Sequence, residues 1–454
     1  MKKVILLAAF LTVSGLAFPE DVQLKSGVVK KGEILEKTDS DVTLKDVNGK
    51  TVTIPFSMIR KDQAETLRAL PNKTVVVEQK ILEVSGPTVN TSSNDRQAAK
   101  EAHDRGLEYE EKQNFDGAMA EYSKAIELDP AYADAYNSRG VFYKKKGNFD
   151  QALLDYSKAI ELAPDYAIAY ANRGFVYGKK GDDAQAISDY SKAIELNPKD
   201  ALVYHHRGLV YKAQGNFDLA ISDYSKVIEL EPDNADVFAN RGNAYSEKGN
   251  FEQAIADFNK AVGLNPNLAN AYYARGAVYQ KMSNLDQAVS DYSRAIELNP
   301  NDADAFNNRG LVYQNIGNFD RAISDYNRAI ALNPADALVY YNRGVCYQSS
   351  NDHGRAISDY NKAIELNPRD ANAYHNRGFG YLNKGDIDQA ILDFNKAIQL
   401  NPNFSEAFIN RSSAFYLKKE YDEAWDDLHK AESLGRDINP RFVEALKRAS
   451  RRDR

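Results

Sequence analysis

The polar residues with the most regular spacing in this chain are arginines and carboxylates. An arginine recurs every 34 residues from Arg105 to Arg411, and an acidic residue recurs at the same interval from Glu121 to Asp427. Such rows allow two kinds of chemistry: the guanidinium groups pair with the carboxylates in a structural ladder, or they bind phosphate or carboxylate groups of a ligand. Because acids and bases recur in step, we interpret them as ion pairs within a repeat or between neighbouring repeats. An exposed pair contributes only about 0–1 kcal/mol, so the ladder is expected mainly to set register.

Residues that could catalyse a reaction are few and dispersed. The sequence contains no phosphate loop, no GxSxG motif and no zinc motif. Cys346 stands where other repeats carry valine, which indicates a packed thiol and not a nucleophile. The adjacent His205 and His206 point in different directions on a helix and are poorly placed to chelate one metal. We therefore expect a protein that is not an enzyme and that uses no cofactor and no metal.

These polar residues are positioned by a repeat of 34 residues. We number each repeat so that its proline is position 32; the tenth copy has Arg436 there instead. Position 20 is alanine in every copy, position 8 is nearly always glycine, and positions 11 and 24 are mostly tyrosine. One structural unit is therefore copied in tandem. The prolines are Pro130, Pro164, Pro198, Pro232, Pro266, Pro300, Pro334, Pro368 and Pro402.

Each repeat has the pattern of two antiparallel helices. Apolar residues at positions 4, 8 and 11, and again at 17, 20, 24 and 27, have helical spacing. Glycines at position 15, such as Gly147, suit a left-handed helix C-cap, and aspartates at position 18, such as Asp150, suit the start of the second helix. In this hairpin we expect position 8 to face position 20 and position 4 to face position 24. The proline ends the second helix because it cannot continue one.

Small residues at 8, 20 and 27, aromatic residues at 4, 11 and 24, and proline at 32 resemble the tetratricopeptide repeat (TPR) family, over residues 97–436 as ten repeats. The resemblance implies an all-α array of stacked helix pairs, a right-handed superhelical solenoid with a concave groove used mainly for protein binding. The chain departs from the commonest pattern at position 4, where Tyr or Phe replaces Trp, and at position 7, where arginine replaces leucine.

The resemblance also implies a ligand surface, made by positions 2, 5, 6, 9, 12 and 13 of the first helix. Asparagine amides offer a donor and an acceptor, so a row of them could bind the backbone of an extended peptide; alternatively, they bond only neighbouring helices. Aspartates at position 2, such as Asp134 and Asp236, argue against a carboxylate clamp and favour neutral, aromatic or basic ligands. The candidate groove residues are Asn172, Asn240, Asn308, Asn342, Asn376, Asn410, His205, Tyr273, Tyr341 and His375.

The N-terminal 17 residues have the pattern of a cleavable signal peptide. Lys2 and Lys3 precede an apolar run over residues 4–13, and Gly15 and Ala17 provide a small-x-small cleavage site. The apolar run is too short for an ordinary transmembrane helix. We therefore expect a periplasmic or secreted protein without stable membrane insertion.

The other segments outside the repeats differ from one another. Residues 18–61 alternate apolar and polar residues between Gly-containing turns, which predicts a small β-meander that resembles an SH3-like barrel. Residues 62–96 are expected to be a linker with one strand. In residues 437–454, Ile438, Phe442 and Leu446 lie on one helical stripe, as needed by a helix that caps the last repeat before a basic tail.

Composition is consistent with a protein-binding scaffold. The chain is 43% hydrophobic and 27% charged, with a net charge of −7, which excludes bulk disorder and makes nucleic acid an unlikely partner. We predict a non-catalytic scaffold or adaptor of the cell envelope that binds other proteins or peptides in the groove. The alternative is a glycan- or cell-wall-binding protein in which the β-module carries the specificity and the repeats are a spacer. Self-association into a structural oligomer is a third interpretation.

Overall fold

The computed structural model describes residues 92–451 in full and, before them, the backbone of five short strands. Strand β1 (Leu7–Ala9) pairs antiparallel with β5 (Gln79–Ile81). Strands β2 (Glu33–Lys37), β3 (Asp41–Lys45) and β4 (Thr51–Pro55) form an antiparallel sheet in chain order. The rest of residues 1–91 lies outside the described residues, and with it the predicted signal peptide, SH3-like module and linker, which stay predictions.

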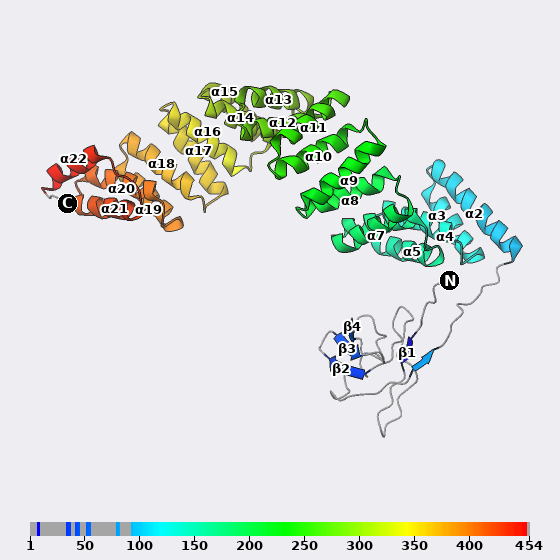
Figure 1. Ribbon diagram of the computed structural model, residues 1–454. Coiled ribbons are helices and arrows are strands. Elements are labelled where there is room, and N and C mark those ends of the chain that lie inside the picture. The colour runs from blue at the N-terminus through cyan, green and yellow to red at the C-terminus, as the bar shows by residue number, and fades with distance from the viewer. Residues whose placement is uncertain are drawn as a thin grey trace, which may run out of the picture. The chain divides into compact units, whose positions relative to one another are not determined.

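The described residues from 92 onward form an all-α array of 21 helices (Figure 1). The first helices of the ten repeats are α2 (Ser93–Glu111), α4 (Ala133–Lys145), α6 (Ala167–Lys179), α8 (Ala201–Ala213), α10 (Ala235–Glu247), α12 (Ala269–Lys281), α14 (Ala303–Asn315), α16 (Ala337–Ser349), α18 (Ala371–Lys384) and α20 (Ser405–Lys418). The second helices are α3 (Phe115–Leu128), α5 (Phe149–Leu162), α7 (Asp183–Leu196), α9 (Phe217–Leu230), α11 (Phe251–Leu264), α13 (Leu285–Leu298), α15 (Phe319–Leu332), α17 (His353–Leu366), α19 (Ile387–Leu400) and α21 (Tyr421–Ser433), and α22 (Pro440–Ser450) follows them.

The chain divides into two units, residues 1–132 and 133–454. In the first, α2 packs against α3. In the second, each first helix packs on the second helix of its own repeat, each second helix packs on the next first helix, and successive first helices such as α4 and α6 also touch. The core is built from the repeated small and aromatic residues: the alanines at position 20 are fully buried, as are most rings at position 24. The sequence pattern of helix pairs is confirmed.

The turn inside each repeat has the left-handed residue that the glycines predict. Gly147, Gly181, Gly215, Gly249, Gly317 and Gly385 all have φ between 75° and 82°. In the other four repeats Gln113, Ser283, Asn351 and Lys419 adopt the same left-handed conformation, with φ between 55° and 66°. The packing of the two helices therefore imposes this turn even where no glycine eases it.

The predicted start of the second helix is wrong by two positions. The N-cap is the asparagine or aspartate at position 16, and not the aspartate at position 18. The side chain of Asn148, for example, accepts a hydrogen bond from the backbone N–H of Gln151, and that of Asp352 from Arg355. The position-18 aspartates lie in the first turn, where a negative charge favours the positive end of the helix dipole.

The expected facing of positions 8 and 20 is also corrected. The glycine at position 8 lies under the ring at position 24: a Cβ on Gly310 would stand 2.8 Å from Cε1 of Tyr326. The same ring contacts position 5, as in the pair Tyr273 and Tyr292, whose centroids are 5.7 Å apart. Glycine is needed at position 8 because the ring of the second helix occupies the space of a side chain.

The last helix covers the end of the array. Leu446 of α22 is fully buried against Trp425 and Leu428 of α21, and Ile438 and Phe442 pack around it. The indole N–H of Trp425 donates to Ser450 Oγ at 3.2 Å. The predicted apolar stripe of this segment thus lies against the final repeat.

Candidate functional site

The arginines at position 7 are held in ion pairs, as predicted. In repeat 8, Arg343 donates from Nε and Nη2 to the two carboxylate oxygens of Asp359, at 2.8 and 2.6 Å, and from Nη1 to Asn327 of the preceding repeat at 2.6 Å. The Asp359 side chain is 7% exposed. This hydrogen bond raises the pKa of Arg343. The ten pairs are Arg105–Glu121, Arg139–Asp155, Arg173–Asp189, Arg207–Asp223, Arg241–Asp257, Arg275–Asp291, Arg309–Asp325, Arg343–Asp359, Arg377–Asp393 and Arg411–Asp427.

Aromatic rings enclose these guanidinium groups. The Arg343 guanidinium carbon lies 5.7 Å from the ring centroid of Tyr340 and 5.9 Å from that of Tyr347, at positions 4 and 11 of the same helix. Arginine stacks on such rings, and its fork matches a carboxylate in two bonds. The arginine row is therefore part of the frame, with its donors already directed at carboxylates and at the neighbouring repeat.

All ten candidate groove residues take part in a second row of contacts, between first helices of successive repeats. Each asparagine at position 6 places its amide nitrogen 2.8–3.3 Å from a polar atom at position 5 of the preceding repeat. These residues are half-buried or buried. The pairs are Asn172 with Asn137, Asn240 with His205, Asn308 with Tyr273, Asn342 with Asn307, Asn376 with Tyr341 and Asn410 with His375.

This row is the alternative that the sequence left open, in which the asparagines bond neighbouring helices. Each bond contributes about 0.5–1.5 kcal/mol net to the junction between two repeats. One donor of each amide is thereby occupied, so binding of a peptide backbone by these residues would depend on the second N–H and on the carbonyl oxygen. Their role in ligand binding stays a prediction.

A third set of contacts was not anticipated from the sequence. Where position 12 is glutamine, its Oε1 accepts the hydroxyl of the buried tyrosine at position 24, as Gln314 does from Tyr326 at 2.8 Å. The hydroxyls of Tyr156 and Tyr224 have no partner within the described part of the chain. Position 12 of those two repeats is lysine, Lys144 and Lys212. Burial raises the pKa of all these tyrosines.

The histidines of the candidate row are held neutral by their surroundings. Burial lowers the pKa of His205 and of His375, and the His375 Nε2 lies 2.8 Å from the amide nitrogen of Asn410. His206 stacks near His205, with centroids 5.9 Å apart, and its pKa is lowered by burial and then by His205. No group of three or more potential metal ligands occurs among the described residues.

The single cysteine lies in the core. Cys346 is fully buried, and its Sγ lies 3.4 Å from Gln314 Oε1, to which the thiol donates. Burial raises its pKa to about 12, which keeps it a thiol at neutral pH. A protonated, inaccessible sulfur is a poor nucleophile.

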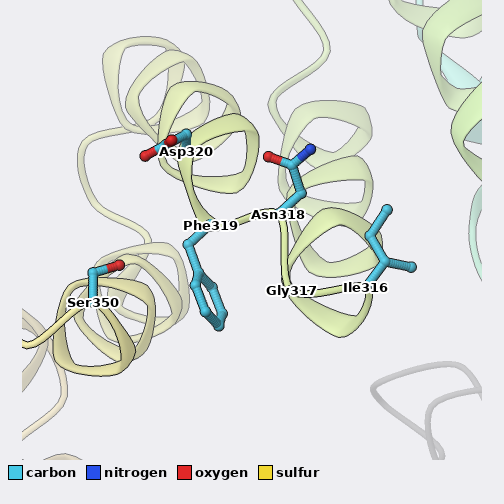
Figure 2. A pocket seen from close by; sticks show the side chains of 6 residues that line it. All are labelled: Ile316, Gly317, Asn318, Phe319, Asp320 and Ser350. Carbon is cyan, nitrogen blue, oxygen red and sulfur yellow. The ribbon is translucent and has the colours of Figure 1, made fainter.

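A shallow depression opens at the outer edge between repeats 7 and 8 (Figure 2). It is lined by the turn between α14 and α15, residues 316–320, and by Ser350 beyond α16. At other junctions a lysine at this position bridges the gap to the aspartate at position 18 of the repeat before: Lys180 pairs with Asp150 at 2.7 Å. Ser350 is too short to reach Asp320 in that way, so the depression is a missing bridge in the frame.

Comparison with known proteins follows the geometry. A family model described as TPR repeat matches residues 106–147, 142–181, 177–215, 209–249 and 242–283. A second, described as tetratricopeptide repeat, matches residues 269–302, 303–336, 337–370 and 371–404. No curated protein sequence matches the chain.

Several solved structures are similar over part of the chain. YrrB, described as a TPR protein with an unusual peptide-binding site, is 30% identical over 41% of this chain and 96% of its own, with a TM-score of 0.37. A tetratricopeptide repeat protein from Parabacteroides merdae is 24% identical over 55% of this chain and 98% of its own, with a TM-score of 0.41. For pilF of Pseudomonas aeruginosa the values are 23%, 49%, 97% and 0.41.

Antiparallel helix pairs, stacked in register and joined by polar rows, define a helical repeat protein. The 34-residue period and the two matching models identify it further: the chain belongs to the tetratricopeptide repeat family, with about ten tandem repeats. Proteins of this family are generally non-catalytic scaffolds for protein–protein interaction. None of the helices in the described part of the chain combines the length and apolar character needed to cross a bilayer.

Proposed function

We propose that this protein is an exported scaffold of the cell envelope that binds partner proteins or peptides along the first helices of its repeats. The observation that carries the proposal is a contrast between frame and surface. Positions 7, 20 and 23 hardly vary among the ten repeats, because they build the ladder and the core. Position 2 of the first helix, by contrast, changes from aspartate to isoleucine, leucine, asparagine and glutamate.

Several of these variable residues are exposed apolar side chains. Ile168, Leu202 and Leu338, all at position 2, are 56%, 61% and 54% exposed. A regular frame that presents a different side chain in each repeat can distinguish one extended ligand from another, as peptide recognition requires. The proposed envelope location is supported by the charged start, apolar run and small-x-small site of residues 1–17.

Site-specific photo-crosslinking tests the binding surface. A benzophenone side chain replaces Leu338 on a first helix, and in a matched control it replaces Leu392, which is 59% exposed on a second helix. We expect crosslinks to one defined set of proteins from position 338 and not from position 392. Equal crosslinking from both would contradict binding along the first helices.

The alternative, in which residues 18–61 bind glycan or cell wall, predicts a different result. The full mature chain would then sediment with purified cell wall, and changes on the first helices would leave this unaffected. Export is tested separately: N-terminal sequencing of protein from the envelope fraction should begin at Phe18, and an intact Met1 there would refute cleavage.

A further inference from the structure

The first helices of repeats 2–4 differ in charge from those of the next three repeats. Apart from the paired arginines, α4, α6 and α8 carry four lysines, Lys144, Lys145, Lys179 and Lys212, against the single acid Asp134. Helices α10, α12 and α14 reverse this balance, with Asp236, Glu247 and Asp304 against Lys281. One segment of the surface is thus basic although the whole chain has a net charge of −7.

The basic groups converge on one aromatic ring. The Nζ atoms of Lys144 on α4 and Lys179 on α6 lie 5.2 and 5.5 Å from the ring centroid of Phe175. The ring of His206 on α8 meets Phe175 edge-on, with centroids 5.4 Å apart. Three successive first helices therefore contribute to a single basic and aromatic cluster, which we call the Phe175 cluster: Lys144, Phe175, Lys179 and His206.

The lysines of this segment have no carboxylate partner. Lys144 donates to the neutral amide oxygen of Asn172 at 2.9 Å, and neither it nor Lys179 forms an ion pair with any residue that the structure describes. Burial and then Lys145 lower the pKa of Lys144. By contrast, the adjacent Lys180 is paired with Asp150. Like charges held together without a counterion repel one another, and an anionic ligand would remove that repulsion.

The internal contacts of these repeats point the same way. At position 12, glutamine in three later repeats accepts the hydroxyl of the buried tyrosine, but Lys144 and Lys212 leave Tyr156 and Tyr224 without a partner. An unsatisfied buried hydroxyl destabilises a protein. A lysine kept at such a position gives up an internal bond for a charge at the surface, as expected of a binding residue and not of a structural one.

Apolar side chains complete the surface. Ile168 and Leu202, at position 2 of α6 and α8, are 56% and 61% exposed. They lie two helical turns from position 9, which is Phe175 on α6, and residues seven apart share one helix face. An occupant of this face therefore meets both positive charge and exposed hydrocarbon.

We propose that the face of α4, α6 and α8 built around the Phe175 cluster binds an acidic peptide segment that also carries apolar side chains. Carboxylates of the segment pair with Lys144 and Lys179, and its apolar side chains pack on Ile168 and Leu202. This proposal rests on the proposed scaffold function and gives that function a ligand class for three of its repeats. It also assigns these repeats the ligand charge opposite to that favoured by the aspartates at position 2 elsewhere.

The test uses the full mature chain and fluorescence anisotropy. The probe is a labelled peptide of alternating glutamate and leucine, and its control replaces each glutamate with glutamine. We expect the acidic probe to bind in a salt-dependent way and the double variant Lys144→Gln/Lys179→Gln to bind it about tenfold more weakly. The matched control, Lys158→Gln/Lys192→Gln, removes two second-helix lysines of the same repeats, which pair with Glu161 and Glu195. It should leave the affinity unchanged.

Loss of folding does not confound this test, because Lys144→Gln should raise the thermal midpoint by giving Tyr156 an acceptor. Equal affinity of both double variants for the acidic probe, or no binding of that probe at all, would overturn the proposal. Tighter binding of a labelled oligouridine to the same lysines would also overturn it, in favour of phosphate recognition. Crosslinking from position 338, in repeat 8, reports on the scaffold function independently, so the failure of one proposal can be distinguished from the failure of the other.

Discussion

Removal of one carboxylate from the ladder should unfold the array locally. In the variant Asp359→Ala, the guanidinium of Arg343 loses two hydrogen bonds and keeps only Asn327 and two aromatic rings. The Arg343 side chain is 18% exposed, so water restores little of what is lost. Breaking a buried ion pair costs about 3–5 kcal/mol, and the remaining exposure places this case at about 2–3 kcal/mol.

The double variant Arg343→Leu/Asp359→Ala should be more stable than the sum of its single changes predicts. It leaves neither an unpaired cation nor an unpaired carboxylate, and leucine is the residue usual at this position in the family that the sequence resembles. We expect a coupling free energy of at least about 2 kcal/mol between the two residues. A ladder that contributed only surface electrostatics would give a coupling close to zero.

Hydrogen exchange followed by mass spectrometry is the suitable assay, since repeat arrays open locally and not as one unit. A loss of about 2 kcal/mol corresponds to roughly 30-fold faster exchange in peptides from α16 and α17. The control variant Lys362→Ala removes an exposed pair with Glu365 in the same repeat and should change exchange by less than about threefold. The reasoning is refuted if Asp359→Ala exchanges no faster than this control, or if the single effects simply add.

Three further predictions concern the core. Gly310→Ala should lower the thermal midpoint by about 1–3 kcal/mol of overpacking against Tyr326, whereas Gly263→Ala, which meets nothing within 4 Å, should raise it by up to about 1 kcal/mol; two similar melts would contradict the fit. Cys346, with a pKa raised to about 12, should react with a thiol reagent only after unfolding, and rapid labelling of the native chain would disprove its burial. Because burial lowers the pKa of His375 below its unfolded value of about 6.5, its neutral form stabilises the fold above that pH, and stability is lost as the pH falls through it. A His375→Asn variant should therefore lose less stability between about pH 7 and 5 than the parent chain, and an equal or larger loss would count against this assignment.

The repeat, its helix pairs and the arginine ladder could be predicted because they are written ten times in one period. The left-handed turn could be predicted from Gly147 and its equivalents, but not at Gln113 or Lys419, where the packing of the hairpin imposes it. The facing of the two helices was predicted wrongly. Helical side chains lean toward the N-terminus of their helix, so the position-24 ring reaches the glycine at position 8, which a count of backbone positions alone does not reveal.

The contacts of the asparagines could not be chosen from one repeat taken alone, because they depend on how neighbouring first helices lie side by side. Yet a signal was present at a spacing of 35 residues. Asparagine stands at position 6 wherever position 5 of the repeat before, from repeat 2 onward, is Asn, His or Tyr. Where that position is Ala171 or Ala239, the next repeat has His206 or Ala274 instead. Comparing positions across the repeat boundary would have favoured the structural contact.

The departures from the frame are informative because the frame is so regular. Repeats 2–4 combine a lysine where glutamine would bond the tyrosine, an alanine where the amide row needs a polar partner, and a histidine where asparagine would complete that row. Each exchange removes a contact that other repeats keep, at Lys144, Ala171 and His206 respectively. Neutral drift would scatter such losses over the array, whereas several of them meet around Phe175, the one ring contacted from three helices. A set of stability losses gathered on one exposed, positively charged face is what selection for binding produces, since residues that serve a ligand need not serve the fold.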